Sequence, residues 1–531
     1  MNILRPADWE YCGATTLDVL VDGIEADGCS AVLFSAEDYF AGHHGPELVL
    51  CRAPLLPFGG GLATATLRGL PAGQICVLAI VQEGVAALIV VCGVNIGRSP
   101  HTRWLVPRAD AAAEAATRIR HPLTLTGSPL SHRAYERAAD VRACDVRACA
   151  DVGALLAAPP GPSGQVLTAP LLPAETLDPR AALVAGPGLG AAPYVSSPSY
   201  LARFGPCLVE LPHGLVQYGS HAIWGDSSHS AFVNDPGMTN VPRMFRTGAG
   251  LGLHIDAVRR CAPAPGLPLI ISNLFHTNHA HWLINSLLPA YLLRDRIAAG
   301  EIAVLVPGRT AYLEATLGSL GIPRDRMIIA DPGLYQMDAA LYASSQSTHN
   351  NDHPPRALVP MFAAIRAACL GGPARPGPER LYVTRMGSGA MRHIANEPAL
   401  IAALARRGFT CVAPHELTFE DEVACFARAR IVVGQLGAAL VNIGFAPPGC
   451  AVVEIASGNY TSNDYLLLSS LFGHRFSRVL APVDTETVHT HRTDFSFTVP
   501  IEQVLDAVDA ALAAAVAASL GDEFPPSASI S

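Results

Sequence analysis

Hydrophobic and polar positions divide this chain into two regions of different pattern. Over residues 1–125, short apolar runs rich in β-branched residues recur between glycines and prolines. The runs are 17–21, 31–34, 47–51, 62–67, 75–81 and 86–92. Strands at this spacing are typical of a sandwich or jelly roll, so we expect a mostly-β module here.

One apolar stretch in this first region, residues 75–94, is about long enough to cross a membrane. Gln82, Glu83 and Gly84 interrupt it midway, and both halves are rich in Val and Ile. A charge at the centre of a membrane span costs about 2.5–3.5 kcal/mol. We therefore expect two strands joined by a turn rather than a membrane helix.

The segment 126–200 predicts a helix followed by a linker. The helical part contains a tandem repeat, Asp140–Cys144 followed by Asp145–Cys149. Its five-residue period matches no helical repeat, which favours a local duplication on a solvated face. Residues 158–200 are rich in Pro, Gly and Ala, a composition typical of linkers.

Within that linker, residues 186–190 read Gly-Pro-Gly-Leu-Gly and mimic a dinucleotide-binding fingerprint. Such a fingerprint needs a helix directly after it, because the helix N-terminus holds the pyrophosphate. Pro193 and Pro198 prevent that helix, so we do not interpret this stretch as a nucleotide site.

From about residue 201 the pattern changes to hairpins and then to strands alternating with helices. Hairpin strands are expected at 207–218 and 221–233. In the first alternating block we expect strands 268–272, 302–306 and 327–330 with helices 278–299 and 311–320. In the second we expect strands 380–384, 410–413, 431–433, 451–453 and 476–480 with helices 398–407, 419–429 and 501–520.

Two such blocks predict an α/β fold with a pair of doubly wound, Rossmann-type lobes. The Gly- and Pro-rich stretch 371–378 is the expected hinge between them. The lobes then span 201–370 and 371–520, and a loose tail follows at 521–531.

One stretch of the second block has the form of an anion site. The buried strand Ile431–Val433 ends in Gly434 to Gly437, and a short helix follows through Ala438–Leu440. Free N–H groups at a helix N-terminus and the positive end of the helix dipole favour a bound anion. The next strand closes on Glu454, which is suited to accept hydrogen bonds from a ribose. An ordinary strand-turn-helix fits the same residues.

Composition removes several classes of function. The formal net charge is −9 and the pI about 6.1, which argues against a protein that binds the nucleic-acid backbone. Every basic residue is Arg, so a Walker P-loop and Schiff-base lysine catalysis are excluded. A bound phosphate would therefore be held by Arg and backbone N–H groups.

The 13 cysteines include no Cys-x-x-Cys pair, as expected of reduced thiols in a cytosolic protein. The first 13 residues carry no basic-then-apolar signal peptide. We therefore expect a cytoplasmic location.

Three ordered stretches resemble the blocks of glycosyltransferase family 61. Asn278–Leu293, NHAHWLINSLLPAYLL, resembles the family's His-Trp-Leu helix. Leu381–Glu397, LYVTRMGSGAMRHIANE, resembles its Tyr-Val-Ser-Arg strand. His415–Gly449, HELTFEDEVACFARARIVVGQLGAALVNIGFAPPG, resembles its C-terminal signature. The resemblance spans roughly residues 200–485 and leaves the first 190 or so unexplained.

This resemblance implies a two-lobed GT-B fold that transfers sugar from a nucleotide-sugar donor. The resemblance implies a bacterial member of the capsule or exopolysaccharide type. Residues 201–370 would then form the acceptor lobe and 371–520 the donor lobe, with the helix at 501–520 packing back on the first lobe. The acceptor would be a polysaccharide or a lipid-linked glycan, and a lipid acceptor would allow peripheral membrane contact.

The donor-binding residues follow from the same motifs. Arg385 lies at the end of a predicted strand, where ligands collect in α/β sheets, and its planar fork suits a diphosphate. Arg392 follows in a Gly-rich loop, and a surface ion-pair residue is the competing interpretation. The remaining candidates are Gly434, Gly437, the N–H groups of Ala438 and Ala439, Asn442, and Glu454 for the ribose.

We expect no metal and no cofactor beyond the donor substrate. Sugar transferases that bind the diphosphate through a divalent ion commonly use Asp-x-Asp, and this chain has none. His276, His279 and His281 stand close together, but their spacing matches no usual zinc arrangement and no Cys or Glu completes it nearby.

His281 is the family-matched histidine and our candidate for the catalytic base, with His279 as its helper. Asp235 is a fallback candidate, as is the pair Asp352-His353. A single base fits direct displacement, so we expect inversion at the anomeric carbon. A hydrogen-bonded core histidine is the competing interpretation of His281.

Two residues depart from the family pattern. Asn285 stands where many relatives have an acidic residue, and Leu436 where they usually have His. A catalytically silent relative that binds sugar or nucleotide is therefore the alternative. An NAD-type or nucleotide-sugar-modifying enzyme is a third reading, and the lack of a proper Gly-x-Gly-x-x-Gly element argues against it.

Overall fold

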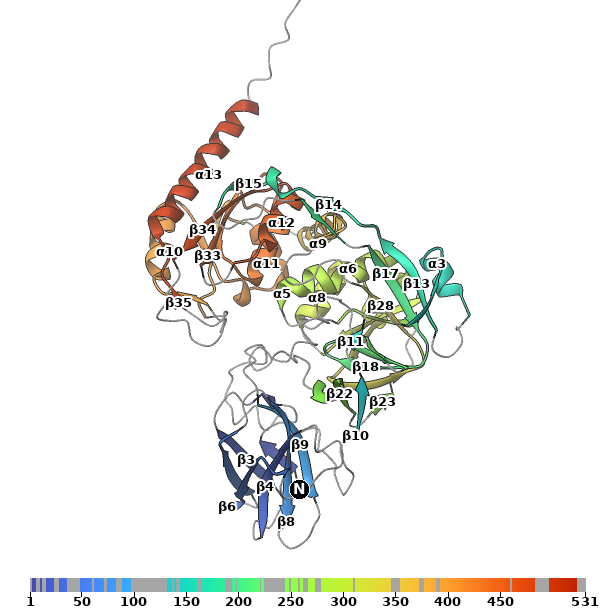
Figure 1. Cartoon of the computed structure of the whole chain (residues 1–531). Helices are drawn as coiled ribbons and strands as arrows, with labels where there is room; N and C mark the ends of the chain where they lie inside the picture. The colour runs from blue at the N-terminus through green and yellow to red at the C-terminus, as the bar shows by residue number, and fades with distance from the viewer. Residues whose placement is uncertain are drawn as a thin grey trace, which may run out of the picture.

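The computed structural model describes most of the chain. The described residues are 2–5, 10–11, 16–22, 28–35, 48–59, 62–70, 74–82, 88–96, 131–135, 138–139, 144–159, 165–186, 193–196, 198–219, 221–223, 244–247, 250–255, 258–260, 266–272, 278–308, 311–344, 354–371, 377–387, 392–458, 461–482 and 496–522. In Figure 1 the strands of the first hundred residues gather in one body, and two α/β sheets with their helices form the other.

The N-terminal strands form two sheets around one core. The first has the order β1 (Asn2–Arg5), β3 (Thr16–Asp22), β7 (Leu62–Arg68), β6 (Leu56–Gly59). The second has the order β2 (Glu10–Tyr11), β9 (Leu88–Ile96), β8 (Gln74–Gln82), β4 (Cys29–Ser35), β5 (Cys51–Pro54). Alternate residues of both sheets, such as Val19 and Leu33, point into the shared core. β8 and β9 pair antiparallel, which confirms two strands in the long apolar stretch.

A seven-stranded mixed sheet begins the second region. Its order is β12 (Asp145–Ala148), β13 (Gln165–Leu172), β17 (Ser199–Phe204), β28 (Ala340–Ala343), β24 (Leu267–Ile270), β25 (Ile302–Pro307), β26 (Met327–Ala330). The last four strands run parallel. Helices α6 (Leu287–Leu292), α8 (Ala311–Ser319) and α9 (Leu358–Leu370) cover one face of this sheet.

Strands rather than helices cover the other face. There a six-stranded sheet runs in the order β11 (Ala138–Ala139), β20 (His221–Ile223), β19 (Leu215–Tyr218), β18 (Cys207–Leu211), β27 (Gly333–Met337), β23 (Val258–Arg260). Phe204 and Leu305 pack against Val209 and Tyr335 in the core between the two sheets. Our prediction of a doubly wound first lobe is thus wrong for the described residues, because the fully buried strands β18 and β19 take the place of helices.

Small sheets and short helical turns complete this region. Three strands pair in the order β10 (Ser131–Tyr135), β22 (Gly250–Ile255), β21 (Met244–Thr247), and two-stranded sheets join β14 (Thr176–Leu177) to β16 (Tyr194–Val195) and β30 (His393–Ile394) to β35 (Ser496–Phe497). The short helices are α3 (Val152–Ala157), η4 (Pro179–Ala181), η6 (Arg324–Arg326) and η7 (Pro414–Glu416).

The helix predicted at 278–299 is present but irregular. It runs as α5 (His279–His281), a π-turn η5 (Trp282–Ser286), α6 and α7 (Arg294–Ala298). Asn278 caps it, because its side-chain oxygen accepts from the N–H groups of Ala280 and His281 at 3.0 and 3.4 Å. Pro289 has no N–H to donate four residues back to Asn285, which accounts for the wider turn there.

The second α/β sheet is wholly parallel. Its order is β15 (Leu183–Ala185), β34 (Arg475–Ala481), β33 (Ala451–Ser457), β32 (Ile431–Gln435), β29 (Arg380–Val383), β31 (Thr410–Val412). Counted from β29, the last five strands have the flavodoxin-like order 2-1-3-4-5. One face carries α11 (Phe419–Phe426), η8 (Ala438–Phe445) and α12 (Asp464–Phe472), and the other carries α10 (Glu397–Ala405) and α13 (Ile501–Asp522).

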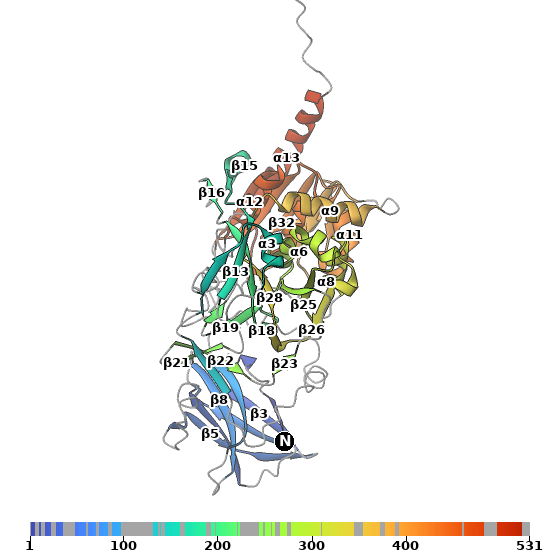
Figure 2. The same ribbon diagram turned by 90° about the vertical axis from the view of Figure 1, so that its right-hand side faces the viewer.

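The two α/β sheets share a single hydrophobic core. Helix α9 packs between them, because Phe362 contacts both Phe445 and Phe472 at ring-centroid distances of 4.7 and 5.2 Å. The buried cluster that contains Phe362 extends from Trp282, beside the first α/β sheet, to Phe476 of the second α/β sheet. Figure 2 shows α6, α9 and α11 side by side in this layer.

Two further predictions are wrong. The stretch predicted as a helix with a tandem repeat contains the exposed strand β12, and the predicted linker supplies β13 and β17 to the first sheet and β15 to the second. The C-terminal helix α13 packs on the second sheet and not on the first lobe, since Val504 and Val508 fill the core beside Val433. In these cases apolar residues from segments of biased composition cover the edges and faces of the sheets.

No helix among the described residues is both long and apolar enough to span a membrane.

Candidate active site

The order in which strands are added to the second sheet reverses between β29 and β32. Two of the residues predicted from the sequence lie next to each other at this point. Ligands of open α/β sheets bind outside the carboxyl ends of the strands at such a switch point. Val383 of β29 is paired with Gly434 of β32, and Arg385 and Gly437 follow just beyond these strands. The Arg385 Nη1 atom donates to the Leu436 carbonyl oxygen at 3.3 Å. A Cβ atom at Gly437 would lie only 2.6 Å from that nitrogen, so the missing side chain makes room for the guanidinium.

A hydrogen bond from helix α12 holds the backbone of this corner in place. The hydroxyl of Tyr465 on α12 donates to the Gly437 carbonyl oxygen at 2.6 Å. Gly437 caps η8 in an extended conformation, with φ 172°, and Ala438 and Ala439 open the helix half-buried. The first N–H groups of a helix have no partner within it, so the corner combines these donors with a guanidinium.

Arg392 also reaches the carboxyl end of β32. Its backbone carbonyl accepts from the Gln435 side chain at 2.8 Å, and its φ of 70° is unusual for a residue other than glycine. A strained backbone of this kind is frequent at ligand sites. Arg392 also lies close enough to Glu454 to lower that carboxyl's pKa.

Glu454 is fully buried in the middle of β33, which continues to Ser457, so the prediction that it ends the strand is wrong. Its Oε1 atom accepts from Arg478 Nε at 2.5 Å, and both side chains are 0% exposed. Burial raises the pKa of Glu454 to about 7, although the charge of Arg478 acts in the opposite direction. Sequence reasoning missed Arg478, whose signal was a lone Arg inside an apolar strand next to the strand of Glu454.

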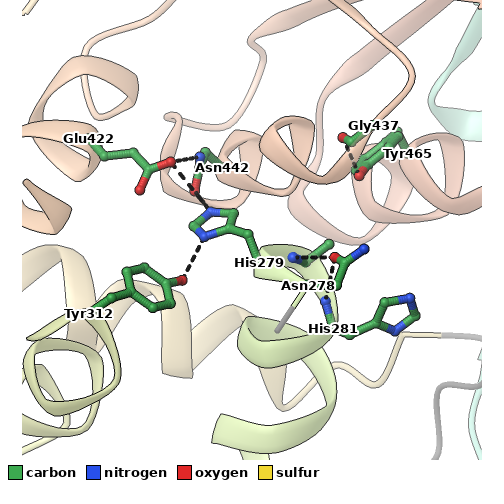
Figure 3. A network of polar contacts seen from close by, with 9 residues as sticks. Asn278, His279, His281, Tyr312, Glu422, Gly437, Asn442 and Tyr465 are labelled. Carbon is green, nitrogen blue, oxygen red and sulfur yellow. Dashed lines mark hydrogen bonds and ion pairs between the residues drawn. The ribbon is translucent and has the colours of Figure 1, made fainter. Parts of the chain in front are cut away.

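His279 belongs to a polar network that joins the two α/β regions (Figure 3). Its Nδ1 atom is 2.6 Å from the Tyr312 hydroxyl of α8, and its Nε2 atom is 3.0 Å from Asn442 Oδ1 of η8. The Asn442 amide in turn donates to Glu422 Oε1 of α11 at 2.5 Å. His279 Nε2 also lies 3.4 Å from that carboxylate oxygen. Both ring nitrogens of His279 thus have protein partners.

Tyr312 and Glu422 were not identified from the sequence. Burial raises the pKa of Glu422, and it raises the pKa of Tyr312 too, with a further contribution from the Glu422 charge. Glu422 occupies the first turn of α11, where three acidic residues follow the Thr418 cap, so it has the pattern of a solvated helix start. Only the packing of η8 and α5 on that turn buries it.

His281 is two residues after His279, but its side chain points in another direction. Figure 3 shows its ring directed away from the His279 network. Its Nδ1 atom is 3.0 Å from Asn285 Oδ1, one helical turn later across the π-turn. Asn285 therefore orients the His281 ring. The sequence had marked Asn285 only as a replacement for an acidic residue and had not suggested this role.

The other candidates are placed as follows. Gly434 is buried in β32, where a Cβ would lie 2.7 Å from Leu440 Cδ2 and 3.2 Å from Val383 Cβ, so it has a packing role. Asp235, the pair Asp352-His353 and His276 lie outside the described residues. Within the described part of the chain, no group of three or more His, Cys, Asp or Glu side chains is placed to hold a metal ion.

Comparison with known families agrees with this geometry. Residues 279–453 match the family model described as Glycosyltransferase 61. The match indicates a glycosyltransferase. It begins at His279 and ends one residue before Glu454, so the Arg385–Gly437 corner and the Glu422–Asn442 network both lie inside it. No curated protein matches the chain.

As a glycosyltransferase, the chain would act on a sugar donor and a glycan acceptor in general.

Proposed function

We propose that this chain is a metal-independent, inverting glycosyltransferase that moves sugar from a nucleotide-sugar donor to a polysaccharide or lipid-linked glycan. The observation that carries the proposal is the guanidinium of Arg385 lying over the side-chain-free corner at Gly437. Such a corner offers a fixed positive charge and helix N–H groups to one anion. The leaving group of sugar transfer is a diphosphate, whose negative charge grows as the bond breaks.

The donor would lie along the carboxyl ends of the second sheet. Arg385 neutralises the diphosphate, the N–H groups of Ala438 and Ala439 complete the cradle, and Arg392 closes it from the neighbouring loop. Glu454 is proposed to face the nucleoside side of the donor. Asn442 acts through His279 and Glu422, because its amide bridges those two side chains.

The base is proposed to be His281. An amide oxygen can only accept, so the Asn285 Oδ1 contact favours the tautomer with the proton on Nδ1. The Nε2 atom then carries the lone pair that takes the acceptor hydroxyl's proton. His279, which has partners at both nitrogens, joins the two regions rather than transferring the proton itself.

The wider assignment follows the same reasoning. The parallel second sheet supports a GT-B-like donor lobe and the first α/β region an acceptor lobe, both preceded by the N-terminal β module. We place the enzyme in bacterial capsule or exopolysaccharide synthesis and in the cytoplasm, where nucleotide sugars are used, with peripheral membrane contact through a lipid-linked acceptor.

One observation favours a catalytically silent relative instead. Leu436, at the position where the family usually has His, is buried in the core and is only 4% exposed. It cannot contact a phosphate through its side chain. A silent protein would bind the nucleotide at the same corner without transferring sugar.

Donor turnover distinguishes these functions. The chain is incubated with uridine, guanosine and cytidine diphosphate sugars, and release of the nucleoside diphosphate is measured. We expect release from one donor class and a loss of donor affinity of about 10- to 100-fold in Arg385→Ala, since a charged hydrogen bond contributes about 1.5–3 kcal/mol.

Arg380→Ala is the matched control, because Arg380 begins the same strand and donates to the Arg407 carbonyl at the opposite edge of the sheet. Binding without release would favour the silent relative. Absence of both binding and release with every donor would reject the proposal.

A further inference from the structure

Glu454 and Arg478 form an ion pair in which the two charges balance, but some of its polar atoms have no hydrogen-bond partner among the described residues. Arg478 uses Nε for Glu454 Oε1 and Nη2 for the Ser462 carbonyl. Among the residues that the structure describes, Glu454 Oε2, Arg478 Nη1 and Ser462 Oγ are buried side-chain atoms without a hydrogen-bond partner. Buried polar groups are almost always paired in native proteins, so three such atoms at one place call for a partner from outside the chain.

The pair lies in the middle of β33 and β34, level with Gly434 of the strand that leads into the proposed phosphate corner. Gly434 of β32, Glu454 of β33 and Arg478 of β34 are directly paired across the sheet. Arg385 follows β29, the next strand on the other side of β32. With neighbouring strands about 4.8 Å apart, the outer two of these four strands are about 14 Å apart. An extended nucleoside diphosphate has dimensions of this order.

The unpaired atoms select the chemistry of the ligand. Oε2 of a carboxylate accepts a hydrogen, and Nη1 of a guanidinium donates one. A phosphate group offers no hydrogen to Oε2 and would be repelled by its charge. A neutral edge with an N–H beside a carbonyl satisfies both atoms at once.

Resting on the function proposed above, we propose that Glu454 and Arg478 form the base-reading subsite of the donor site. Their ligand is the edge of uracil or guanine, in which an acidic ring N–H stands beside a carbonyl. Glu454 accepts from the ring N–H, and Arg478 donates to the carbonyl. Cytosine and adenine have only amino hydrogens on this edge, which are weaker donors to a carboxylate. The subsite therefore prefers uridine or guanosine nucleotides.

Access requires the segment Thr461–Asn463 to move. Its Ser462 carbonyl accepts from Arg478, and this segment leads into α12, so it closes the subsite from above. Opening breaks that contact and the hydrogen bond from the Asn463 amide to the Tyr194 hydroxyl, and it leaves the Ser462 hydroxyl next to the entering ligand. The Glu454–Arg478 pair itself stays in place.

The test replaces the pair with apolar residues in the double variant Glu454→Leu/Arg478→Met. A buried ion pair contributes little net stability compared with a packed apolar pair, so the variant is expected to fold with an unchanged or higher Tm. Binding of UDP, GDP, CDP, ADP and inorganic pyrophosphate is measured by calorimetry. The wild type should bind UDP or GDP at least about tenfold more tightly than CDP and ADP. The double variant should lose that preference yet bind pyrophosphate as before.

Glu454→Gln, which keeps the side-chain size, is the second variant in case the double variant does not fold, and it should reduce the same preference. Two analogues show whether the subsite recognises the base or the ribose. UDP methylated at N3 lacks the ring N–H of the base, and 2′-deoxy-UDP lacks a hydroxyl of the ribose. The corresponding guanosine analogues serve if GDP is preferred. Weaker binding of the N-methyl analogue alone supports the proposal, whereas weaker binding of the deoxy analogue alone overturns it in favour of the ribose.

Equal binding of all four nucleotides, or an unchanged preference in the variants, also overturns it. In that case the proposed function still stands if pyrophosphate binds and Arg385→Ala abolishes that binding. If wild-type protein binds neither nucleotides nor pyrophosphate, the proposed function fails as well.

Discussion

His279 and His281 are two residues apart, but hydrogen bonds give them different chemistry. His279 is held at both ring nitrogens, by Tyr312 and by Asn442. His281 is held by Asn285 at Nδ1. The sequence predicted His281 as the catalytic base and His279 as its helper, but it did not reveal the hydrogen bonds that distinguish the two. That distinction depends on Tyr312 and Asn442, which lie 33 and 163 residues away along the chain.

We expect His281→Ala to lower kcat by about 10²- to 10⁴-fold with a smaller change in KM, because a general base acts in the transition state. Asn285→Ala should lower kcat less, since the ring keeps its nitrogen but loses its orientation. His279→Gln is the comparison. It should lower the free energy of unfolding and leave the pH profile of kcat unchanged. Steady-state kinetics of the three variants check this, and an unchanged kcat in His281→Ala would remove His281 as the base.

Single residues also mark the limit of what the sequence can reveal. Gly437 was predicted from the strand-turn-helix pattern and Arg385 from the end of its own strand, and a Cβ at Gly437 would lie 2.6 Å from the Arg385 Nη1 atom. Arg478 and Glu422 were not predicted, because each becomes part of the site only through a neighbouring strand or helix. Glu454 was predicted as a strand-end acid, and its burial against Arg478 could not be read from its own strand.

At the level of elements, the turn from β32 into η8 sets the shape of the proposed phosphate corner. A Cβ at Gly437 meets Arg385 Nη1, whereas a Cβ at Gly434 meets the packed side chains of Leu440 and Val383. The Gly437 backbone is extended, a conformation that alanine also adopts. The two glycines of one turn thus serve different purposes.

We therefore expect Gly437→Ala to displace the Arg385 side chain and weaken nucleoside diphosphate binding about tenfold or more, with a loss of stability below about 1 kcal/mol. Gly434→Ala should lower the free energy of unfolding by about 1–3 kcal/mol, because it overpacks the core. Calorimetric binding and denaturant unfolding of both variants test this. Nucleotide affinity that survives in Gly437→Ala would argue against a phosphate at this corner.

A buried histidine joins the start of β34 to η8. His474 Nε2 donates to the Ile443 carbonyl at 2.9 Å, and burial lowers the pKa of this side chain from 6.5 to about 4. The folded state therefore favours neutral His474. The stability that results is fully present above pH 6.5 and is lost as the pH falls toward 4.

We expect the unfolding free energy of wild type to fall more steeply than that of His474→Gln between pH 6.5 and 4. Since one pKa unit corresponds to about 1.4 kcal/mol, the difference across this window is of the order of 3 kcal/mol. Taking the difference between the two proteins cancels the titration of Glu422 in α11 and of Glu454 in β33. Parallel pH profiles would contradict the assignment.

At the scale of the whole molecule, the buried apolar side chains of the described residues form four clusters. The N-terminal sandwich has its own core, and the two α/β sheets share another through α9. The sequence predicted the strands and helices of the second region well, because their apolar periods are clear. It failed where β-strands cover a sheet face and where a Pro-rich stretch supplies β13 and β15, since burial there is decided by distant partners.

The shared core predicts that the two α/β regions unfold together. Phe362 of α9 is fully buried against Phe445 and Phe472, and Gly444 approaches its ring so closely that a Cβ there would lie 2.5 Å from it. Phe362→Ala should lower the free energy of unfolding by about 3–5 kcal/mol. In scanning calorimetry it should shift a single α/β transition and leave the transition of the N-terminal sandwich unchanged. Separate transitions for the two sheets would contradict a shared core.

The proposed function requires that Arg385 and the Gly437 corner bind the diphosphate of the donor. A crystal structure of the chain with a bound nucleoside diphosphate is the decisive test. We predict phosphate oxygens at about 2.7–3.2 Å from the Arg385 guanidinium and from the first N–H groups of η8. A diphosphate bound elsewhere, with Arg385 still donating to the Leu436 carbonyl, would contradict it.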